Sequence, residues 1–382
     1  MWPYMRTGTP FEVRKTNSQN VDFNIALRSR RAIVPELNKM ALNPGSSAYI
    51  SDILLQPQCL RRLRMSEIGD AAGAIGGAIS SFGRVVLTGM GSSHAALRPL
   101  WTSLVQNGVP TWRVDAAECL GHFMPLINAS TLVIVASQSG RSAEIVVLAA
   151  EVKERGAKLL AITNDVDSPL ALQADAVVDM RVGSEEAVST KTYLNTLGVG
   201  LVLERLFLGK AFDQILERTA DVLEAYLKSW RRRTEVLKER VGLPDRLYVL
   251  ARGSSLAAAE YGALIAKEAA RWPVEAESVS QFRHGPLELA DERLSVIILA
   301  GGEASARRHN RTLHDDLARY GAKTFWMDVE PGDHPFAVPD VEPDARWIVE
   351  AVPLQLLSVA LAEQSGIAPG EFRHLTKVTT VL

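Results

Sequence analysis

The stretch RVVLTGMGSS at residues 84–93 returns as RLYVLARGSS at residues 246–255, an offset of 162 residues. Two further pairs follow in the same order: STLVIVASQSG from residue 130 matches RLSVIILAGGE from 293, and ERGAKLLAIT from 154 matches RYGAKTFWMD from 319. Their offsets, 163 and 165 residues, are nearly the same. Three ordered matches predict two copies of one structural unit, and one large sheet with chance similarity is the alternative.

Continuous apolar runs alternate with helical stretches in the first copy. We expect strands at 84–88, 131–136, 159–163 and 174–180, separated by helices that include 95–107 and 142–155. Apolar strands separated by helices are typical of a parallel sheet that is covered on both faces. The sequence therefore predicts an α/β protein with two tandem three-layer α/β/α units.

The repeat also predicts the domain boundaries. We expect an N-terminal arm at 1–64 with a helix at 23–38, a first unit at 65–210, a helical linker at 211–240, a second unit at 241–365 and a C-terminal tail at 366–382.

The composition is that of an ordinary globular protein. Of 382 residues, 47% are hydrophobic and 23% are charged, and the net charge is −2. This balance predicts no nucleic-acid or membrane-surface partner. Cys59 and Cys119 are the only cysteines, and the seven histidines are scattered. We therefore expect a cytoplasmic protein with no disulfide framework, no metal site and no cofactor.

The turn after the first strand has residues that suit an anion. Gly91, Ser92 and Ser93 stand between a strand and a helix, where glycine allows close approach and free N–H groups attract negative charge. His94 stands in place of the third glycine of a dinucleotide fingerprint, so support for a nicotinamide cofactor is incomplete. The two serines favour a phosphate, and a small-residue turn without a ligand is the alternative.

A second polar turn follows the strand at 131–136. Ser137, Gln138, Ser139 and Ser142 provide three hydroxyls and one amide within six residues, which are donors suited to a phosphate or a sugar. Ligands of open parallel sheets bind beyond the carboxyl ends of the strands. We therefore expect both turns to converge on one site, and a solvated loop is the alternative.

Later in the first copy, Glu185 and Ser189 lie in the segment 183–191. They can add a carboxylate and a hydroxyl to the same pocket. Helix capping by Glu185 is the alternative, because a negative charge is favourable in the first turn of a helix.

The second copy and the tail provide groups for proton transfer and covalent chemistry. Glu268 lies on a helical stretch, and His284 follows 16 residues later, directly before Gly285 and Pro286. A carboxylate and an imidazole suit acid–base catalysis near neutral pH, although either residue alone is more often solvated or structural. Lys377 is a surface charge or, inside a pocket, an amine that can form an imine with a carbonyl.

Four segments together resemble the sugar isomerase (SIS) superfamily: SQSGRSAEI from residue 137, EEAVSTKTYLNTL from 185, FRHGPLEL from 282 and LTKVTTVL from 375. The chain is similar to the double-domain members, namely the isomerase domain of glucosamine-6-phosphate synthase and the SIS-type glucosamine-6-phosphate deaminases. The resemblance runs from about residue 51 to the C-terminus. It implies a flavodoxin-like α/β unit that occurs twice, usually in a dimer.

The resemblance also implies roles for the residues. The phosphate of a sugar 6-phosphate would sit on the two serine-rich turns of the first unit. Glu268 would move a proton between C1 and C2, and His284 would open the ring, in relatives from the partner subunit of a homodimer. Lys377 would form an imine with the open-chain ketose.

The sequence departs from the family pattern at three places. The glutaminase domain of the synthase has no counterpart, so we do not expect glutamine to supply ammonia. Relatives often have a lysine three residues before the glutamate, where this sequence has Ile265. In the second copy, Ala300-Gly301-Gly302-Glu303 replaces SQSG, so we expect one sugar site per chain.

The predicted function is that of a phosphosugar isomerase or deaminase. It would convert glucosamine 6-phosphate, or a close analogue, to fructose 6-phosphate and ammonia. The alternatives are an aldose–ketose isomerase, a sugar–amine deglycase and a non-catalytic sugar-phosphate sensor. A nicotinamide-dependent dehydrogenase has only the incomplete glycine turn in its favour.

Overall fold

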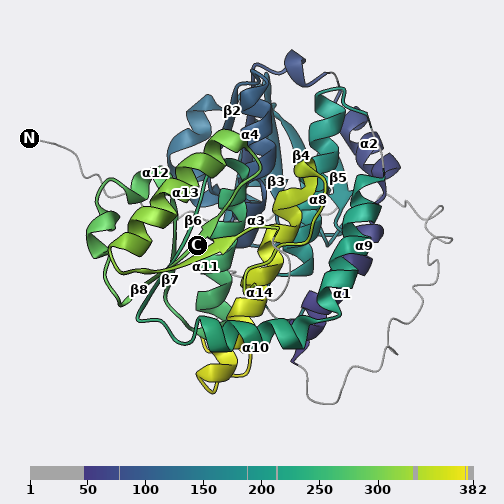
Figure 1. Cartoon of the computed structure of the whole chain (residues 1–382). Coiled ribbons are helices and arrows are strands. Elements are labelled where there is room, and N and C mark those ends of the chain that lie inside the picture. The colour runs from purple at the N-terminus through teal and green to yellow at the C-terminus, as the bar shows by residue number, and fades with distance from the viewer. Residues whose placement is uncertain are drawn as a thin grey trace, which may run out of the picture. The chain divides into compact units, whose positions relative to one another are not determined.

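The structure is a computed structural model that describes residues 47–76, 78–186, 188–211, 214–329, 334–374 and 376. These residues contain two sheets, one of five strands and one of four (Figure 1). The helix expected at 23–38 lies outside the described residues.

The first sheet has the strand order β2-β1-β3-β4-β5, and every strand pair is parallel. Its strands are β1 Arg84–Gly89, β2 Thr111–Arg113, β3 Thr131–Ala136, β4 Lys158–Thr163 and β5 Ala176–Asp179. Its helices are α2 Met65–Ala74, α3 Gly91–Ala96, α4 Arg98–Gln106, α5 Ala116–Glu118, α6 Ala143–Glu154, α7 Pro169–Gln173 and α8 Lys191–Phe207. Val85 and Leu87 belong to one core cluster and Val86 to another, because alternate side chains of a strand point to opposite faces.

The second sheet repeats this topology with the order β7-β6-β8-β9, again with parallel pairs. Its strands are β6 Arg246–Ala251, β7 Val274–Ser278, β8 Leu294–Leu299 and β9 Lys323–Met327. Its helices are α11 Leu256–Ala270, α12 Val279–Phe282, α13 Ala304–Arg319 and α14 Arg346–Gln364, and a 3₁₀ turn, η4, spans Gly253–Ser255. The prediction of two tandem α/β/α units with parallel sheets is confirmed.

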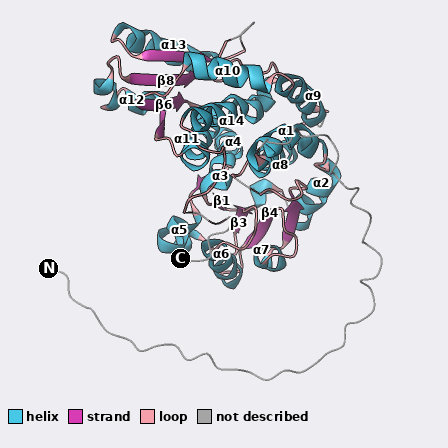
Figure 2. Ribbon diagram, turned by 90° about the horizontal axis from the view of Figure 1, so that it is seen from below, coloured by secondary structure: helices cyan, strands magenta, loops and turns pink. Residues whose placement is uncertain are grey.

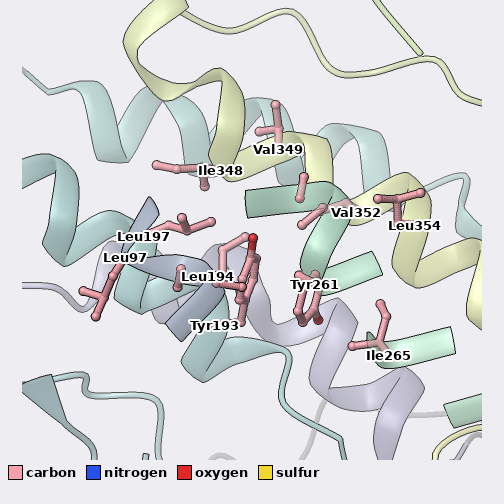
Figure 3. Close-up of a cluster of buried hydrophobic side chains, with 14 of the residues drawn as sticks. Leu97, Tyr193, Leu194, Leu197, Tyr261, Ile265, Ile348, Val349, Val352 and Leu354 are labelled. Carbon is pink, nitrogen blue, oxygen red and sulfur yellow. The ribbon is translucent and has the colours of Figure 1, made fainter. Parts of the chain in front are cut away.

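The helices between the two sheets form a shared core. Figure 2 shows α4, α8, α11 and α14 between the sheet of β1 and β3 and the sheet of β6 and β8. Tyr193 of α8 stacks on Tyr261 of α11, with ring centroids 3.7 Å apart and planes inclined by 8° (Figure 3). Both rings are buried among aliphatic side chains from three helices. The two units are therefore held together by buried apolar surface, the dominant favourable term in folding.

Three helices outside the repeat also pack on this core. They are α1 Ala48–Arg61, α9 Ile215–Leu227 and α10 Trp230–Arg240. Helix α1 contains Pro57, yet its Tyr49 hydroxyl pairs with Ser358 of α14 at 2.9 Å and its Gln56 pairs with Gln355 at 2.8 Å. The last part of the expected arm is thus a core helix.

Helix α14 lies at the centre of the molecule (Figures 1 and 2). Among the described residues, the helical stretch Pro343–Gln364 is the one long and apolar enough to cross a membrane, with a mean hydropathy of 1.4. Because 89% of its apolar window is buried inside the protein, its apolarity is explained by its place in the core.

Candidate active site

The candidate site lies where the order of the first sheet reverses, between β1 and β3. In a 2-1-3-4-5 sheet, this switch point is where ligands bind, beyond the carboxyl ends of the strands. Gly89 ends β1 opposite Ala136, which ends β3. A Cβ on Gly89 would lie 2.6 Å from the Ala136 carbonyl oxygen, so only glycine allows the two strand ends to approach this closely. The two polar turns that follow are therefore neighbours, as predicted.

Most of the predicted phosphate donors have no partner inside the protein. Within the described residues, the hydroxyls of Ser92, Ser93 and Ser142 and the side-chain amide of Gln138 form no hydrogen bond, and all four residues are partly exposed. Ser142 precedes α6 at the N-cap position without a side-chain cap hydrogen bond. These groups are therefore free to donate to a ligand.

The backbone around the second turn is fixed by its own hydrogen bonds. The Ser137 hydroxyl accepts a hydrogen bond from the Gly140 N–H at 3.2 Å, and the Ser139 hydroxyl accepts one from the Arg141 N–H at 3.2 Å. Gly140 has φ +60, and a Cβ there would lie 2.1 Å from the Ser168 hydroxyl. The glycine is thus required, and the hydroxyl protons of Ser137 and Ser139 stay available because both oxygens act as acceptors.

Helix α11 carries Glu268 toward the first unit. It packs on α3, and Leu264 lies 3.6 Å from the position that a Cβ on Gly91 would occupy. Glu268 follows Leu264 by one helical turn and so lies on the same face. Burial raises the pKa of the Tyr49 phenol, and the charges of Glu268 and Glu185 raise it further. The Glu268 carboxylate is therefore brought to the side of the sheet where the serine-rich turns lie.

A set of ion pairs that the sequence did not predict, formed by Glu260, Arg98 and Arg113 and called the charged clamp below, fixes α11 against the first unit. Glu260 of α11 forms ion pairs with Arg98 of α4 and with Arg113 of β2, the latter at 3.1 Å. Arg113 also donates to the His94 carbonyl oxygen at 2.8 Å. No local sequence signal reveals these pairs, because their members are 147 and 162 residues apart.

His94 stays neutral inside this clamp. Burial and the nearby charge of Arg113 lower the pKa of His94 to about 4. Its Nε2 atom is buried without a hydrogen-bond partner among the described residues. The residue that breaks the dinucleotide fingerprint is thus an uncharged side chain beside the polar turn.

Glu185 and Ser189 form hydrogen bonds with residues at the start of α8. The Glu185 carboxylate accepts hydrogen bonds from the backbone and hydroxyl groups of Thr190 and Thr192 at 2.7–3.3 Å. The Ser189 hydroxyl pairs with that of Thr192 at 2.8 Å. These contacts match the capping alternative for Glu185.

His284 lies at the other end of the second unit from Glu268. Glu268 precedes the amino end of β7, whereas His284 follows its carboxyl end and is exposed. The five residues of β7 alone span about 17 Å. The structure therefore does not bring Glu268 and His284 of one chain together.

The other predicted catalytic group, Lys377, lies outside the described residues. The chain just before it reaches Glu268, because His374 and Phe372 line the same depression of about 500 Å³ as Glu268 and Trp272.

Two residues of α11 close to the glutamate have partners inside the protein. Ile265 is fully buried in the shared core (Figure 3). Lys267 lines the same depression as Glu268 and forms an ion pair with Glu275 of β7 at 3.1 Å.

The SIS domain family profile matches residues 78–203 and 244–323, more than half of the chain. This chain belongs to the SIS domain family. The predicted resemblance is confirmed, and each match covers one of the two α/β units described above.

Among curated relatives, the glutamine–fructose-6-phosphate aminotransferase (isomerizing) of Gloeobacter violaceus is 30% identical over 366 residues, which is 87% of this chain and 58% of that enzyme. The chain spans 46–63% of the length of the curated relatives it matches.

Two solved structures show the same fold. A glucosamine-6-phosphate deaminase from Thermotoga maritima has a TM-score of 0.71 at 21% identity, covering 88% of this chain and all of that one. A tagatose-6-phosphate ketose/aldose isomerase from Escherichia coli has a TM-score of 0.72 at 18% identity, covering 85% and 94%. Since these two proteins are named for different reactions, the fold alone does not select one.

Proposed function

We propose that the protein converts a phosphorylated amino sugar, glucosamine 6-phosphate or a close analogue, to fructose 6-phosphate and ammonia. The observation that carries this proposal is the set of unpartnered hydroxyl and amide donors at the β1/β3 switch point, with the Glu268 helix packed against it. Donors to a charged phosphate are about twice as strong as neutral ones. The phosphate would thus hold one end of the sugar on the turns.

The proposed proton transfer uses Glu268. In the open-chain amino aldose, Glu268 takes the proton from C2 and delivers it to C1, while a proton of the amine passes to the C1 oxygen. This leaves a hydroxyl at C1 and an imine at C2. Water adds to that imine, and ammonia leaves as the C2 carbonyl forms. A carboxylate positioned for such a step contributes about 10²–10⁴-fold to the rate. Lys377 would form an imine with the resulting C2 carbonyl, with release of water, and so hold the ketose.

Ring opening is assigned to His284 of a second copy. Because His284 and Glu268 of one chain lie at opposite ends of β7, a complete site needs His284 of the partner subunit, and we propose a homodimer for this reason. Mixing Glu268→Gln with His284→Asn should restore activity that neither variant has alone. A mixture that stays inactive would contradict the shared site.

Aldose–ketose isomerisation is the second candidate. It needs the same proton transfer between C1 and C2 but no loss of ammonia. The observation that favours it is Ile265, a fully buried apolar side chain at the position where relatives often have a lysine.

We also propose a cytoplasmic location. Cys59 and Cys119 are both buried free thiols, and burial raises the pKa of each to about 11. Such thiols suit a reducing compartment.

Ammonia release from glucosamine 6-phosphate, measured with a coupled glutamate dehydrogenase assay, tests the proposal. We expect equal amounts of ammonia and fructose 6-phosphate. Interconversion of sugar phosphates without ammonia would support the second candidate. Binding of the sugar phosphate without any turnover would contradict both and favour a sensor.

A further inference from the structure

The two units contact each other through corresponding elements. Residues 162 apart correspond in the repeat, and Arg98 forms an ion pair with its own counterpart, Glu260. Helix α11 packs on the turn after β1, and α4 packs in return on η4, the turn after β6. Each of these two helices therefore packs on the turn at the strand end of the other unit.

The counterpart of Glu268 is Gln106, at the end of α4. The Gln106 amide nitrogen donates to the Glu303 carboxylate at 3.3 Å, and Glu303 follows β8. Gln106 is thus aimed at the switch point of the second sheet, between β6 and β8.

A cavity of about 470 Å³ occupies this second switch point. That volume falls within the range of small-molecule sites. Its walls come from the turns after β6 and β8 and from the ends of α4 and α14, and the side chains used below are Gln106, Arg252, Ser254, Glu303, Ser305 and Trp347.

Several of these groups have no partner within the protein. Among the described residues, the Arg252 guanidinium and the Ser254 hydroxyl make no ion pair or hydrogen bond. The Trp347 indole Nε1 is buried without a hydrogen-bond partner. Ser305 stands where the first unit has Ser142, at the repeat offset of 163. The cavity therefore has hydroxyl groups at positions that correspond to those of the first site, and it also has a cation, Arg252.

The other charged side chains of the cavity are already paired. Lys210 binds Glu204 at 2.6 Å, Arg346 binds Glu350 at 2.9 Å, and Asp344 meets Arg205 at 3.4 Å. Among the described residues of the cavity wall, Arg252 and Glu303 are therefore the charged side chains that form no ion pair. A complementary ligand carries one anionic group and, at some distance, hydroxyl or ammonium groups.

We propose that this cavity is a second, non-catalytic site for a phosphorylated sugar or amino sugar. The phosphate binds Arg252 and Ser254, and the hydroxyl or amino groups bind Glu303 and Gln106. The ligand is not turned over, because the Gln106 amide cannot accept the proton that Glu268 accepts in the first site. The ligand class rests on the proposed function. The expectation of one sugar site per chain, drawn from the loss of the SQSG turn, is thereby replaced.

Calorimetric titration with glucosamine 6-phosphate tests the inference in the full chain carrying Glu268→Gln, which prevents consumption of the ligand. We expect two binding events per chain. Adding Arg252→Glu should weaken one of them at least tenfold, as loss of a charged hydrogen bond implies. Ser254→Asp, which adds a carboxylate to the cavity, should do the same. The matched control Arg308→Glu, an exposed arginine of α13 outside the cavity wall, should leave both events.

Ser139→Ala in the same background separates this inference from the proposed function. A single event that Ser139→Ala weakens and Arg252→Glu leaves intact would overturn the second site and keep the first. A single event that Arg252→Glu weakens and Ser139→Ala leaves intact would support the second site and contradict the proposed placement of substrate. Two events that both survive Arg252→Glu and Ser254→Asp would overturn the inference.

Discussion

The two α/β units share one topology and differ at their strand ends. The first unit ends β1 and β3 in turns rich in free hydroxyls, whereas the second ends β6 and β8 in turns that present Arg252 and Glu303. The helix that closes each switch point also differs, since α11 supplies Glu268 and α4 supplies Gln106. The same scaffold thus offers a carboxylate at one site and an amide at the other. If both proposals hold, the residues at the strand ends, and not the sheet, separate the functions of the two sites.

Replacing the carboxylate that distinguishes the first site should have the largest effect. We expect Glu268→Gln to lower the kcat for ammonia release about 10²–10⁴-fold, the contribution of a positioned acid–base group. Binding of fructose 6-phosphate, followed by the shift in Tm, should change little. The matched control is Lys267→Gln, which alters the adjacent residue that pairs with Glu275 and should keep near-normal turnover. Turnover that survives Glu268→Gln would show that the carboxylate of residue 268 does not distinguish the first site from the second.

The two units should also contribute differently to the pH dependence of stability, because the first has His94 where the second has Leu256. Burial and Arg113 lower the pKa of His94 to about 4 in the folded protein, against about 6.5 in the unfolded chain. As pH falls from 6.5 to 4, the unfolded state takes up a proton that the folded state does not. The free energy of unfolding should therefore fall, by up to about 3 kcal/mol.

Urea denaturation at a series of pH values measures this effect. His94→Leu, which copies the second unit, should flatten the curve between pH 4 and 6.5. His122→Leu, at a side chain that is 73% exposed, should leave the slope unchanged. An equal slope in wild type and His94→Leu would show that another group is responsible.

Removing one hydroxyl of the first site should weaken sugar-phosphate binding by roughly tenfold, as expected for one hydrogen bond to a charged group. Ser139→Ala is the test, because this side chain lies in the turn after β3. Ser130→Ala is the control, since Ser130 precedes the same strand and donates to Asn128. Equal affinities of the two variants for fructose 6-phosphate would place the phosphate elsewhere.

The packing of helices within each unit should show a smaller difference between the two units. In the second unit, a Cβ on Gly262 of α11 would lie 2.5 Å from Leu354 of α14. In the first unit, a Cβ on Gly200 of α8 would lie 3.8 Å from Leu100 of α4. We expect Gly262→Ala to cost about 1–2 kcal/mol, because overpacking exceeds the gain in helix propensity.

Gly200→Ala should be neutral or stabilising by up to about 1 kcal/mol. Chemical denaturation of both variants measures the difference. Equal stabilities would show that the α11–α14 contact can relax.

The repeat explains how much of this could be predicted from the sequence. The apolar runs and their constant offset predict both sheets, and the position of SQSG after β3 predicts the first site, since ligands gather at strand ends. Helix α1 was not predicted; it contains Pro57, and a proline inside a helix removes a backbone hydrogen bond. The Arg113–Glu260 clamp joins residues 147 apart, so no local pattern reveals it. The second cavity depends on α4 and α14, which no motif connects to β6.

A crystal structure of the Glu268→Gln variant with glucosamine 6-phosphate would test the central claim most directly. The account predicts the phosphate on the turns after β1 and β3, within hydrogen-bond distance of Ser139 and Gln138, with C1 and C2 of the sugar facing residue 268. A sugar phosphate bound only elsewhere, with these two turns in contact with solvent alone, would contradict it.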